Sequence, residues 1–220
     1  MTPAPVQRVI AYIDGFNVYH GLRAGRLRRF YWLDLRRLSQ NLLRPPQTLV
    51  FTKYFTARIS GAWPGDPPDR ARHLNAERKR QSDFLEALDT LPDFKRYDGH
   101  FLGKAVTCRA CGASWRTHEE KMTDVQIATE LLTDAFQDRF DTALLMSADS
   151  DLVPPTLAVQ RIFRKKRIVV AFPPSRVSVE LGKAASAHFT IGRRKLAVSQ
   201  FPDEVKKADG FVLRRPAEWR

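Results

Sequence analysis

The residues of this sequence whose types and spacing could support catalysis are four aspartates: Asp14, Asp124, Asp149 and Asp151. Asp14 closes one apolar run, Asp149 and Asp151 follow another, and Asp124 begins an amphipathic segment. Carboxylate oxygens are the ligands that Mg²⁺ and Mn²⁺ prefer, and such an ion can activate water and neutralise charge on a phosphodiester. The pattern predicts a Mg²⁺ or Mn²⁺ site held by Asp14, Asp124 and Asp149, with Asp151 as a further ligand or as a group that orients water.

Each aspartate also has an ordinary structural interpretation. Asp14 could form a turn or cap a helix, Asp124 could be a first-turn acid, and Asp149 and Asp151 could cap the helix that follows them. Their joint placement at the ends of different elements favours one site, because the groups of an active site commonly come from several elements. Asn17 would offer its amide to a phosphate or a metal-bound water, and Ser147 would fix the turn before Asp149.

The elements that must position these residues alternate along the chain. Apolar, β-branched runs predict strands at 8–13, 48–59, 142–146, 167–172 and 188–191. Helical periodicity predicts helices at 15–23, 33–43, 70–91, 123–137, 151–164 and 175–185. Thr123, followed by Gln126, is expected to cap the fourth of these helices.

This alternation predicts an α/β protein with a mainly parallel sheet covered by helices on both faces. Active sites of such sheets lie beyond the carboxyl ends of the strands, where Asp14, Asp149 and Asp151 fall. Residues 1–200 are expected to form one domain with an insertion at about 94–118, read as an irregular or β-rich excursion. Residues 201–220 are expected to be a basic C-terminal tail.

The charge of the chain favours a polyanionic partner. The formal net charge is +13, and residues 161–220 hold 15 Lys or Arg against five Asp or Glu. RNA is the expected partner, with a soluble enzyme that is merely basic as the alternative. Arg23, Arg26, Arg28 and Arg29 would grip phosphates, and the adjoining aromatic residues, Phe30, Tyr31 and Trp32, would either stack on bases or belong to the core.

Two cysteines, Cys108 and Cys111, form the sequence's CxxC motif. Followed by Gly112, they have the shape of half a zinc knuckle, and a closed structural zinc site needs four ligands. Because the chain has no other cysteine, His100 and His118, or a second chain, would have to complete a Zn²⁺ site. The alternative is a pair of reduced thiols in a β-turn.

The sequence contains neither a signal-peptide pattern nor an apolar run of the roughly 20 residues that a membrane helix needs. A cytoplasmic protein without membrane contact is therefore expected. Its oligomeric state is left open by the sequence.

Three segments resemble the NYN domain family of PIN-like ribonucleases in order and spacing. They are YIDGFNVYHGL at 12–22, EEKMTDVQIATELLTDAF at 119–136 and LLMSADSDLVPP at 144–155, within a similarity that spans about residues 8–192. The resemblance implies a three-layer α/β/α PIN-like, Rossmann-like fold, a divalent metal and endoribonuclease activity.

Matched by motif, the acidic positions of the family fall on the four aspartates, accompanied by Asn17. Lys121 matches a lysine often found before the helix; it would contact phosphate or pair with a nearby Glu. A catalytically silent RNA-binding module is the main alternative function. A phosphatase of the haloacid dehalogenase kind is disfavoured, because Phe16 stands where its second aspartate is needed.

Overall fold

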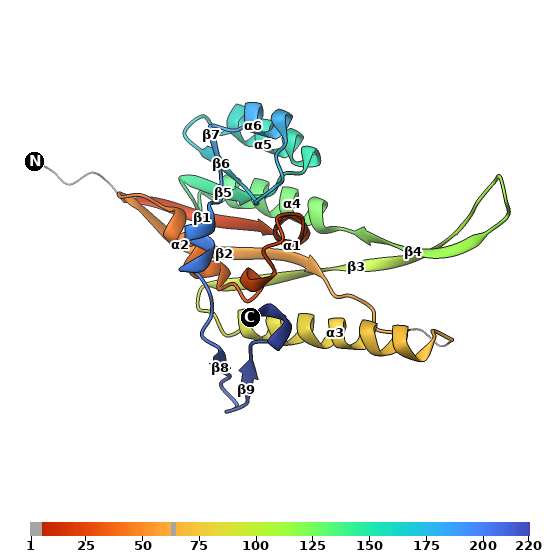
Figure 1. The fold of residues 1–220 in the computed structure, drawn as a ribbon. Helices are drawn as coiled ribbons and strands as arrows, with labels where there is room; N and C mark the ends of the chain where they lie inside the picture. The colour runs from red at the N-terminus through yellow and green to blue at the C-terminus, as the bar shows by residue number, and fades with distance from the viewer. Residues whose placement is uncertain (1–5, 63–64) are drawn as a thin grey trace, which may run out of the picture.

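The computed structural model describes residues 6–62 and 65–220, apart from the side chains of 104, 105 and 115–120. A seven-stranded sheet runs through the molecule in the order β4-β3-β2-β1-β5-β6-β7, and only β4 pairs in an antiparallel manner (Figure 1). The strands are β1 (Gln7–Asp14), β2 (Gln47–Ala57), β3 (Phe94–Thr107), β4 (Ser114–Lys121), β5 (Thr142–Met146), β6 (Arg167–Phe172) and β7 (Ala187–Thr190).

The apolar runs around the candidate aspartates form the centre of this sheet. β1 lies between β2 and β5, with Ile13 opposite both Tyr54 and Met146. Every residue of β5 is buried, as expected for a parallel strand covered on both faces. Because β1 and β5 are adjacent and parallel, Asp14 and the residues that follow Met146 reach the same carboxyl edge.

Helices cover both faces of the sheet. The face with α1, α2, α3 and α7 is packed through residues such as Val18, Leu38, Leu88 and Leu196. The face with α4, α5 and α6 is packed through residues such as Ile127, Val159 and Leu181. The helices are α1 (Gly15–Ala24), α2 (Leu35–Leu42), α3 (Pro68–Leu88), α4 (Thr123–Phe136), α5 (Val153–Ile162), α6 (Val179–Ala184) and α7 (Arg193–Ala197), with 3₁₀ turns η1 (Arg28–Phe30) and η2 (Ser150–Leu152). The predicted three-layer α/β fold is confirmed.

The expected excursion at 94–118 has two different halves. Residues 94–99 of β3 are a regular strand of the sheet, parallel to β2, so this half is not an insertion. From His100 onward β3 pairs only with β4, and the two strands extend beyond the body of the molecule (Figure 1). We call residues 100–121 the arm. The sequence did not predict the strand at 94–99, because residues 95–100 are mostly polar and the partner strand β2 is distant in sequence.

Residues 201–220, expected to be a basic tail, fold back onto α3. They form the two-stranded sheet of β8 (Glu204–Lys206) and β9 (Val212–Arg214), followed by η3 (Ala217–Trp219). The Trp219 side chain is buried beside Trp32 and Phe84, with ring centroids 6.2 Å from each. Lys207 also donates to Glu86 of α3 over 2.9 Å. The segment is therefore part of the core on the α3 side.

One predicted cap is wrong. Thr123 is the first residue of α4, and the N-cap is Met122, whose φ of 83° places it in the left-handed region. Gln126 does not complete a capping box; its side chain donates to the carbonyl of Asp98 in β3 over 3.4 Å. This contact fastens the start of α4 to the base of the arm. No helix of the described residues is long and apolar enough to cross a membrane.

Candidate functional site

Asp14 ends the central strand and begins the first helix. Its side chain caps α1 by accepting a hydrogen bond from the backbone N–H of Asn17. The next residue, Gly15, packs so closely on β2 that an added Cβ would lie 2.6 Å from the Tyr54 hydroxyl and 2.8 Å from the Phe55 carbonyl. Only glycine fits there, and this close packing fixes the direction in which Asp14 enters the site.

Neutral donors hold the Asp14 carboxylate in place. Oδ1 accepts from the Asn17 N–H over 3.0 Å, while Oδ2 accepts from the Asn17 amide over 2.6 Å and from the Ser147 hydroxyl over 2.8 Å. Asn17 Oδ1 in turn accepts from the Ala148 N–H over 3.3 Å. Asn17 thus ties β1 to the loop after β5 with both ends of its amide, so its first role is to position Asp14.

The predicted role of Ser147 is confirmed. Its hydroxyl accepts from the Asp149 N–H over 3.0 Å, which fixes the turn after β5. Asp149 then caps η2 by accepting from the Asp151 N–H over 3.0 Å. Asp149 is half-buried and Asp151 is exposed. Asp14, Asn17, Ser147 and Asp149 therefore form one connected group, which we call the strand-end cluster.

Burial raises the pKa of Asp14 above its usual value, and the charge of Asp149 adds to the increase, while hydrogen bonds from Asn17 and Ser147 oppose it. Asp14 is only 2% exposed. Among the residues that the structure describes, no Lys, Arg or His forms an ion pair with Asp14. A buried carboxylate next to a second acid, without a protein cation, is an electrostatically costly arrangement that a bound cation would relieve.

Asp124 belongs to α4, whose first turn follows the arm directly. It lies in the first turn of α4, which begins where Lys121 pairs with His100, just past the end of β2. α4 also packs against η2, the turn that Asp149 caps. The base of the arm lies beside the carboxyl edge, because the rings of Phe16 in α1 and Phe101 in β3 meet edge-to-face with centroids 5.5 Å apart. Lys121 is half-buried at the same place.

The donor set fits a hard cation held by few protein ligands. Within the described part of the chain, no three Asp, Glu, His or Cys side chains lie close enough together to hold a metal ion as they stand. Mg²⁺ usually keeps several waters and binds through one or two carboxylates, which matches Asp14 and Asp149. Asp124 would join such a site only through water or by a shift of α4, so its predicted role as a ligand stays a prediction.

The predicted RNA-binding arginines divide into two groups. Burial lowers the pKa of His20, and the nearby positive charges of Arg176 and Arg23 lower it further. α1 passes the residues after β6 here, since Gly21 lies against Pro173 and Pro174. Arg23 is therefore at the carboxyl edge. Arg28 and Arg29 belong to η1, which packs on η3, and the exposed Arg26 lies between the two groups.

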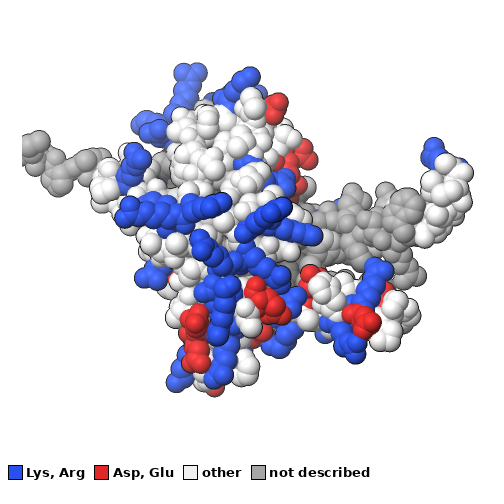
Figure 2. All heavy atoms as spheres, in the orientation of Figure 1, with Lys and Arg blue, Asp and Glu red and all other residues white. Residues whose placement is uncertain are grey.

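Stacking of bases on the neighbouring aromatic residues is not supported by their positions. Phe30 and Trp32 are buried, and Trp32 donates from its indole N–H to the Pro202 carbonyl over 2.8 Å. Tyr31 is half-buried between Tyr19 and Trp219. These rings are core residues. The arginines contribute to a broad basic surface, and Lys and Arg are spread over the face shown in Figure 2.

A second polar group, which the sequence did not predict, lies under α4. Lys53 of β2 is 3% exposed and pairs with Glu130 over 2.6 Å and with Asp134 over 2.5 Å. Tyr12 donates to Asp134 over 2.5 Å, and Tyr97 donates to Glu130 over 2.7 Å. We call these five residues the helix-docking cluster. The signal for it was a lysine in an apolar strand together with acids spaced i, i+4 on the helix.

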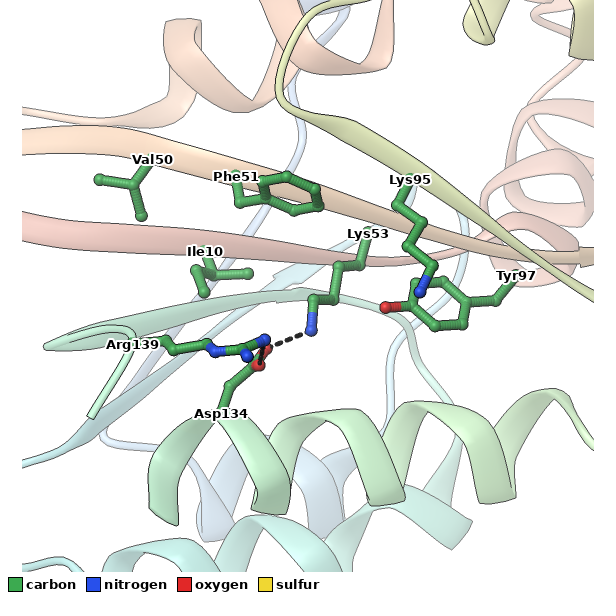
Figure 3. A pocket seen from close by; sticks show the side chains of 8 residues that line it. All are labelled: Ile10, Val50, Phe51, Lys53, Lys95, Tyr97, Asp134 and Arg139. Atoms are coloured by element: carbon green, nitrogen blue, oxygen red, sulfur yellow. Dashed lines mark hydrogen bonds and ion pairs between the residues drawn. The ribbon is translucent and has the colours of Figure 1, made fainter. Parts of the chain in front are cut away.

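The helix-docking cluster borders a pocket of about 300 Å³ between the sheet and the end of α4. Figure 3 shows Lys53 directed at Asp134, with Arg139 approaching the same carboxylate and Lys95 lying at the Tyr97 ring. Every acid of this cluster is matched by a cation. Its evident role is to anchor α4 on β2, which sets where the helix begins at the carboxyl edge.

The predicted zinc ligands are not brought together. Cys108 and Cys111 lie at the tip of the arm, in a turn closed by hydrogen bonds from the Cys108 N–H to Ala113 and from the Gly112 N–H to Cys108. His100 is at the base of the arm, where its backbone pairs with Lys121. The His118 side chain lies outside the described residues, and its backbone pairs with Gly103. The backbone positions do not support a Zn²⁺ site made by these four residues in one chain, and Zn²⁺ binding at the CxxC motif stays a prediction.

Comparison with known proteins agrees with this architecture. The sequence profile of the NYN domain matches residues 8–192. The chain belongs to the NYN domain family. NYN domains have a PIN-like, nuclease-type fold and are typically associated with RNA. The matched range contains every element of the strand-end cluster and the whole arm.

Two further proteins are similar to this NYN protein. One is named 6-hydroxy-3-succinoylpyridine 3-monooxygenase HspA, from Pseudomonas putida, and is 30% identical over 192 residues. The match covers 76% of this chain and 60% of the relative, so the chain spans about 60% of that protein's length. The other is a crystal structure of a protein of unknown function from Vibrio parahaemolyticus. It matches with a TM-score of 0.52 and 18% identity over 86% of this chain and 96% of that chain, which is a likeness of fold.

Proposed function

We propose that this NYN protein is a metal-dependent endoribonuclease that hydrolyses RNA phosphodiester bonds at its strand-end cluster. The observation that carries the proposal is the buried Asp14 carboxylate, held by neutral donors beside Asp149 and without a cationic partner among the described residues. The family, the position at the carboxyl edge and the net charge of +13 support the same function.

Each residue of the site has a distinct role in this proposal. Asp14 and Asp149 would hold Mg²⁺ or Mn²⁺, with Asp124 joining through water, and the bound ion would activate a water and offset charge on the scissile phosphate. Asn17 and Ser147 keep Asp14 from rotating. Asp151, which is exposed and beside Asp149, is suited to orient the attacking water.

The RNA would approach along the edge between the arm and α1. Lys121 at the base of the arm and Arg23 near the end of α1 are the predicted phosphate-binding residues nearest this edge. Arg26, Arg28 and Arg29 would extend the basic path toward η3. Contacts of this kind act through charge on the phosphate backbone and therefore weaken as salt rises.

The direct test is cleavage of a mixed RNA pool by the purified protein with Mn²⁺ or Mg²⁺. We expect EDTA to abolish cleavage and Asp14→Asn to lower its rate by about 10³-fold, because the variant removes the charge that would attract the metal. Asp138→Asn is a matched control. Asp138 is exposed at a left-handed position that Asn tolerates, two residues past the C-terminal end of α4, where it pairs with Arg8 and Lys166. Cleavage by folded Asp14→Asn at the wild-type rate contradicts the proposal.

A catalytically silent RNA-binding module is the second candidate. It is favoured by one observation: within the described residues, three metal-binding side chains do not meet. Such a module would bind the RNA pool with the same affinity in the wild type and in Asp14→Asn, and neither would cleave it with Mn²⁺. The cleavage assay and a filter-binding assay on the same samples separate the two candidates.

The relative from Pseudomonas putida suggests a third candidate, a monooxygenase acting on a substituted pyridine. The cluster of acids and the basic surface are less suited to a small anionic substrate than to RNA. An oxygen electrode with 6-hydroxy-3-succinoylpyridine and a nicotinamide reductant tests it. Oxygen uptake that depends on the pyridine, without RNA cleavage, would replace the endoribonuclease proposal.

A further inference from the structure

The tip of the arm carries a pair of thiols with no assigned role. Cys108 is half-buried, Cys111 is exposed, and both are free. The turn that holds them is well defined: Cys108 N–H donates to Ala113 over 2.8 Å, Gly112 N–H donates to Cys108 over 2.9 Å, and Gly112 takes a φ of 70°. This positive φ is a conformation that glycine adopts readily.

The turn holds the two cysteines in one closed loop, because the backbone hydrogen bonds of the Cys108 and Gly112 N–H groups span it. Two cysteines three residues apart in such a turn provide half of a tetrahedral zinc site, which is closed by four ligands.

Within the described residues, no third His, Cys, Asp or Glu side chain joins the two cysteines in a group that could hold a metal ion. The backbone of His118 pairs with Gly103, five residues along the strand from Cys108, and that of His100 lies eight residues away. At about 3.4 Å per residue these separations are roughly 17 and 27 Å, too far for one ion bound at about 2.1–2.3 Å. Neither histidine is therefore placed to complete the site, and a second chain is the alternative source of ligands.

The arm presents its tip where a second copy can reach it. From His100 to Thr107, β3 is paired only with β4, so the tip stands beyond the rest of the sheet and past the end of α3, which runs in the same direction (Figure 1). In this position the tip is open to a second arm that meets it end to end. The charge balance is also suited to a site shared by two chains. Four thiolates around Zn²⁺ carry a net charge of two negative units, and Arg109, which lies between the two cysteines of each chain, offsets one unit per chain.

We propose that the arm is a dimerisation device in which Cys108 and Cys111 of two copies bind one Zn²⁺ ion between the two tips. Zinc would then set the oligomeric state, and metal removal would separate the copies without unfolding either one. The strand-end clusters lie at the bases of the arms, so each copy keeps a complete site of its own. This proposal does not depend on ribonuclease activity.

The test uses the full chain, purified under reducing conditions and loaded with Zn²⁺. We expect one zinc per two chains by elemental analysis, and a doubling of the 25.2 kDa mass by light scattering that EDTA reverses. Substitution with Co²⁺ should give the intense charge-transfer and d–d absorption of tetrathiolate coordination. Cys108→Ser and Cys111→Ser should each remain monomeric and lose these bands.

Ala113→Ser is the matched control, since it adds a hydroxyl to the same turn and keeps both thiols. We expect it to dimerise as the wild type does, and His118→Ala to leave the metal stoichiometry unchanged. One zinc per monomer that is lost in His118→Ala would overturn the proposal in favour of an intramolecular site. A monomer without metal, or a dimer that keeps its mass in EDTA and in Cys108→Ser, would overturn it as well.

Discussion

The strand-end cluster and the helix-docking cluster both bury a carboxylate at the same sheet, yet they treat its charge in opposite ways. Asp134 is fully buried and meets Lys53 over 2.5 Å and Arg139 over 3.3 Å. Asp14 is also buried, but among the described residues it meets the neutral groups of Asn17 and Ser147 and the negative charge of Asp149. One carboxylate is neutralised within the fold, and the other has no cationic partner among the described residues, which supports the proposed metal site.

This difference distinguishes a cluster that stabilises the fold from a cluster that is suited to bind a ligand. A buried acid with its own cation stabilises packing and has no spare charge for a ligand. A buried acid held by neutral donors keeps its geometry while its charge stays available, which is the preorganisation that a metal site needs. Substitutions should therefore lower stability at the helix-docking cluster and lower activity at the strand-end cluster.

The largest effect is expected for Lys53→Met. Removing this lysine leaves Asp134 and Glu130 without their main cation, and breaking a buried ion pair costs about 3–5 kcal/mol of unfolding free energy. Urea denaturation followed by circular dichroism measures the loss. Cleavage per folded molecule should fall by less than it does in Asp149→Asn, because Lys53 acts on the site only through the position of α4.

Lys95→Met is the control for this substitution. Lys95 lies opposite Lys53 on β3, is exposed, and rests on the Tyr97 ring. We expect it to change the unfolding free energy by less than about 0.5 kcal/mol. If Lys53→Met and Lys95→Met had the same unfolding free energy, the stabilising role of the helix-docking cluster would be contradicted.

The converse substitution is Asp149→Asn. Asparagine keeps the oxygen that caps η2, so the unfolding free energy should change by less than about 0.5 kcal/mol. The lost charge should lower RNA cleavage by about 10²-fold, equivalent to about 3 kcal/mol of transition-state stabilisation. Single-turnover cleavage with Mn²⁺ measures this. A smaller loss is expected for the exposed Asp151→Asn, and an equal loss would show that the two acids share one role.

The smallest effect is expected for Glu130→Gln, and it should depend on pH. Burial raises the pKa of Glu130, but hydrogen bonds from Lys53 and Tyr97 outweigh it, so the pKa lies below its usual value. A lowered pKa in the folded state contributes stability that is present above the unfolded pKa of about 4.3 and is lost as pH falls through the folded pKa. We expect the variant to lose about 1 kcal/mol at pH 7.

Denaturation between pH 3 and pH 8 checks this expectation. The difference between the wild type and Glu130→Gln should shrink as pH falls below about 4. Glu180→Gln, an exposed change on α6, should differ little from the wild type at every pH. A difference that is constant from pH 3 to pH 8 would mean that the charge of Glu130 is not what stabilises the cluster.

The local parts of the site were predictable and the long-range parts were not. The apolar runs predict that strands end at Asp14 and Met146. The hydrogen bond from the Asp149 N–H to Ser147 could be predicted because Ser147 lies two residues before Asp149. The pairing of Lys53 with Glu130 joins residues 77 positions apart, and no local pattern fixes it. The predicted cap of α4 was wrong because Met122, directly after β4, is the N-cap in a left-handed conformation, which leaves Thr123 inside the helix.

The burial of Trp219 has a practical consequence for anyone who trims this chain. The NYN match ends at residue 192, and a recombinant fragment cut there would lack Leu196, Phe201, Leu213 and Trp219. Trp32 and Phe84, which these residues cover, would become an apolar patch open to solvent. Such a fragment would be prone to aggregate although every predicted catalytic residue is present. The boundary suited to expression therefore lies beyond the boundary of the family.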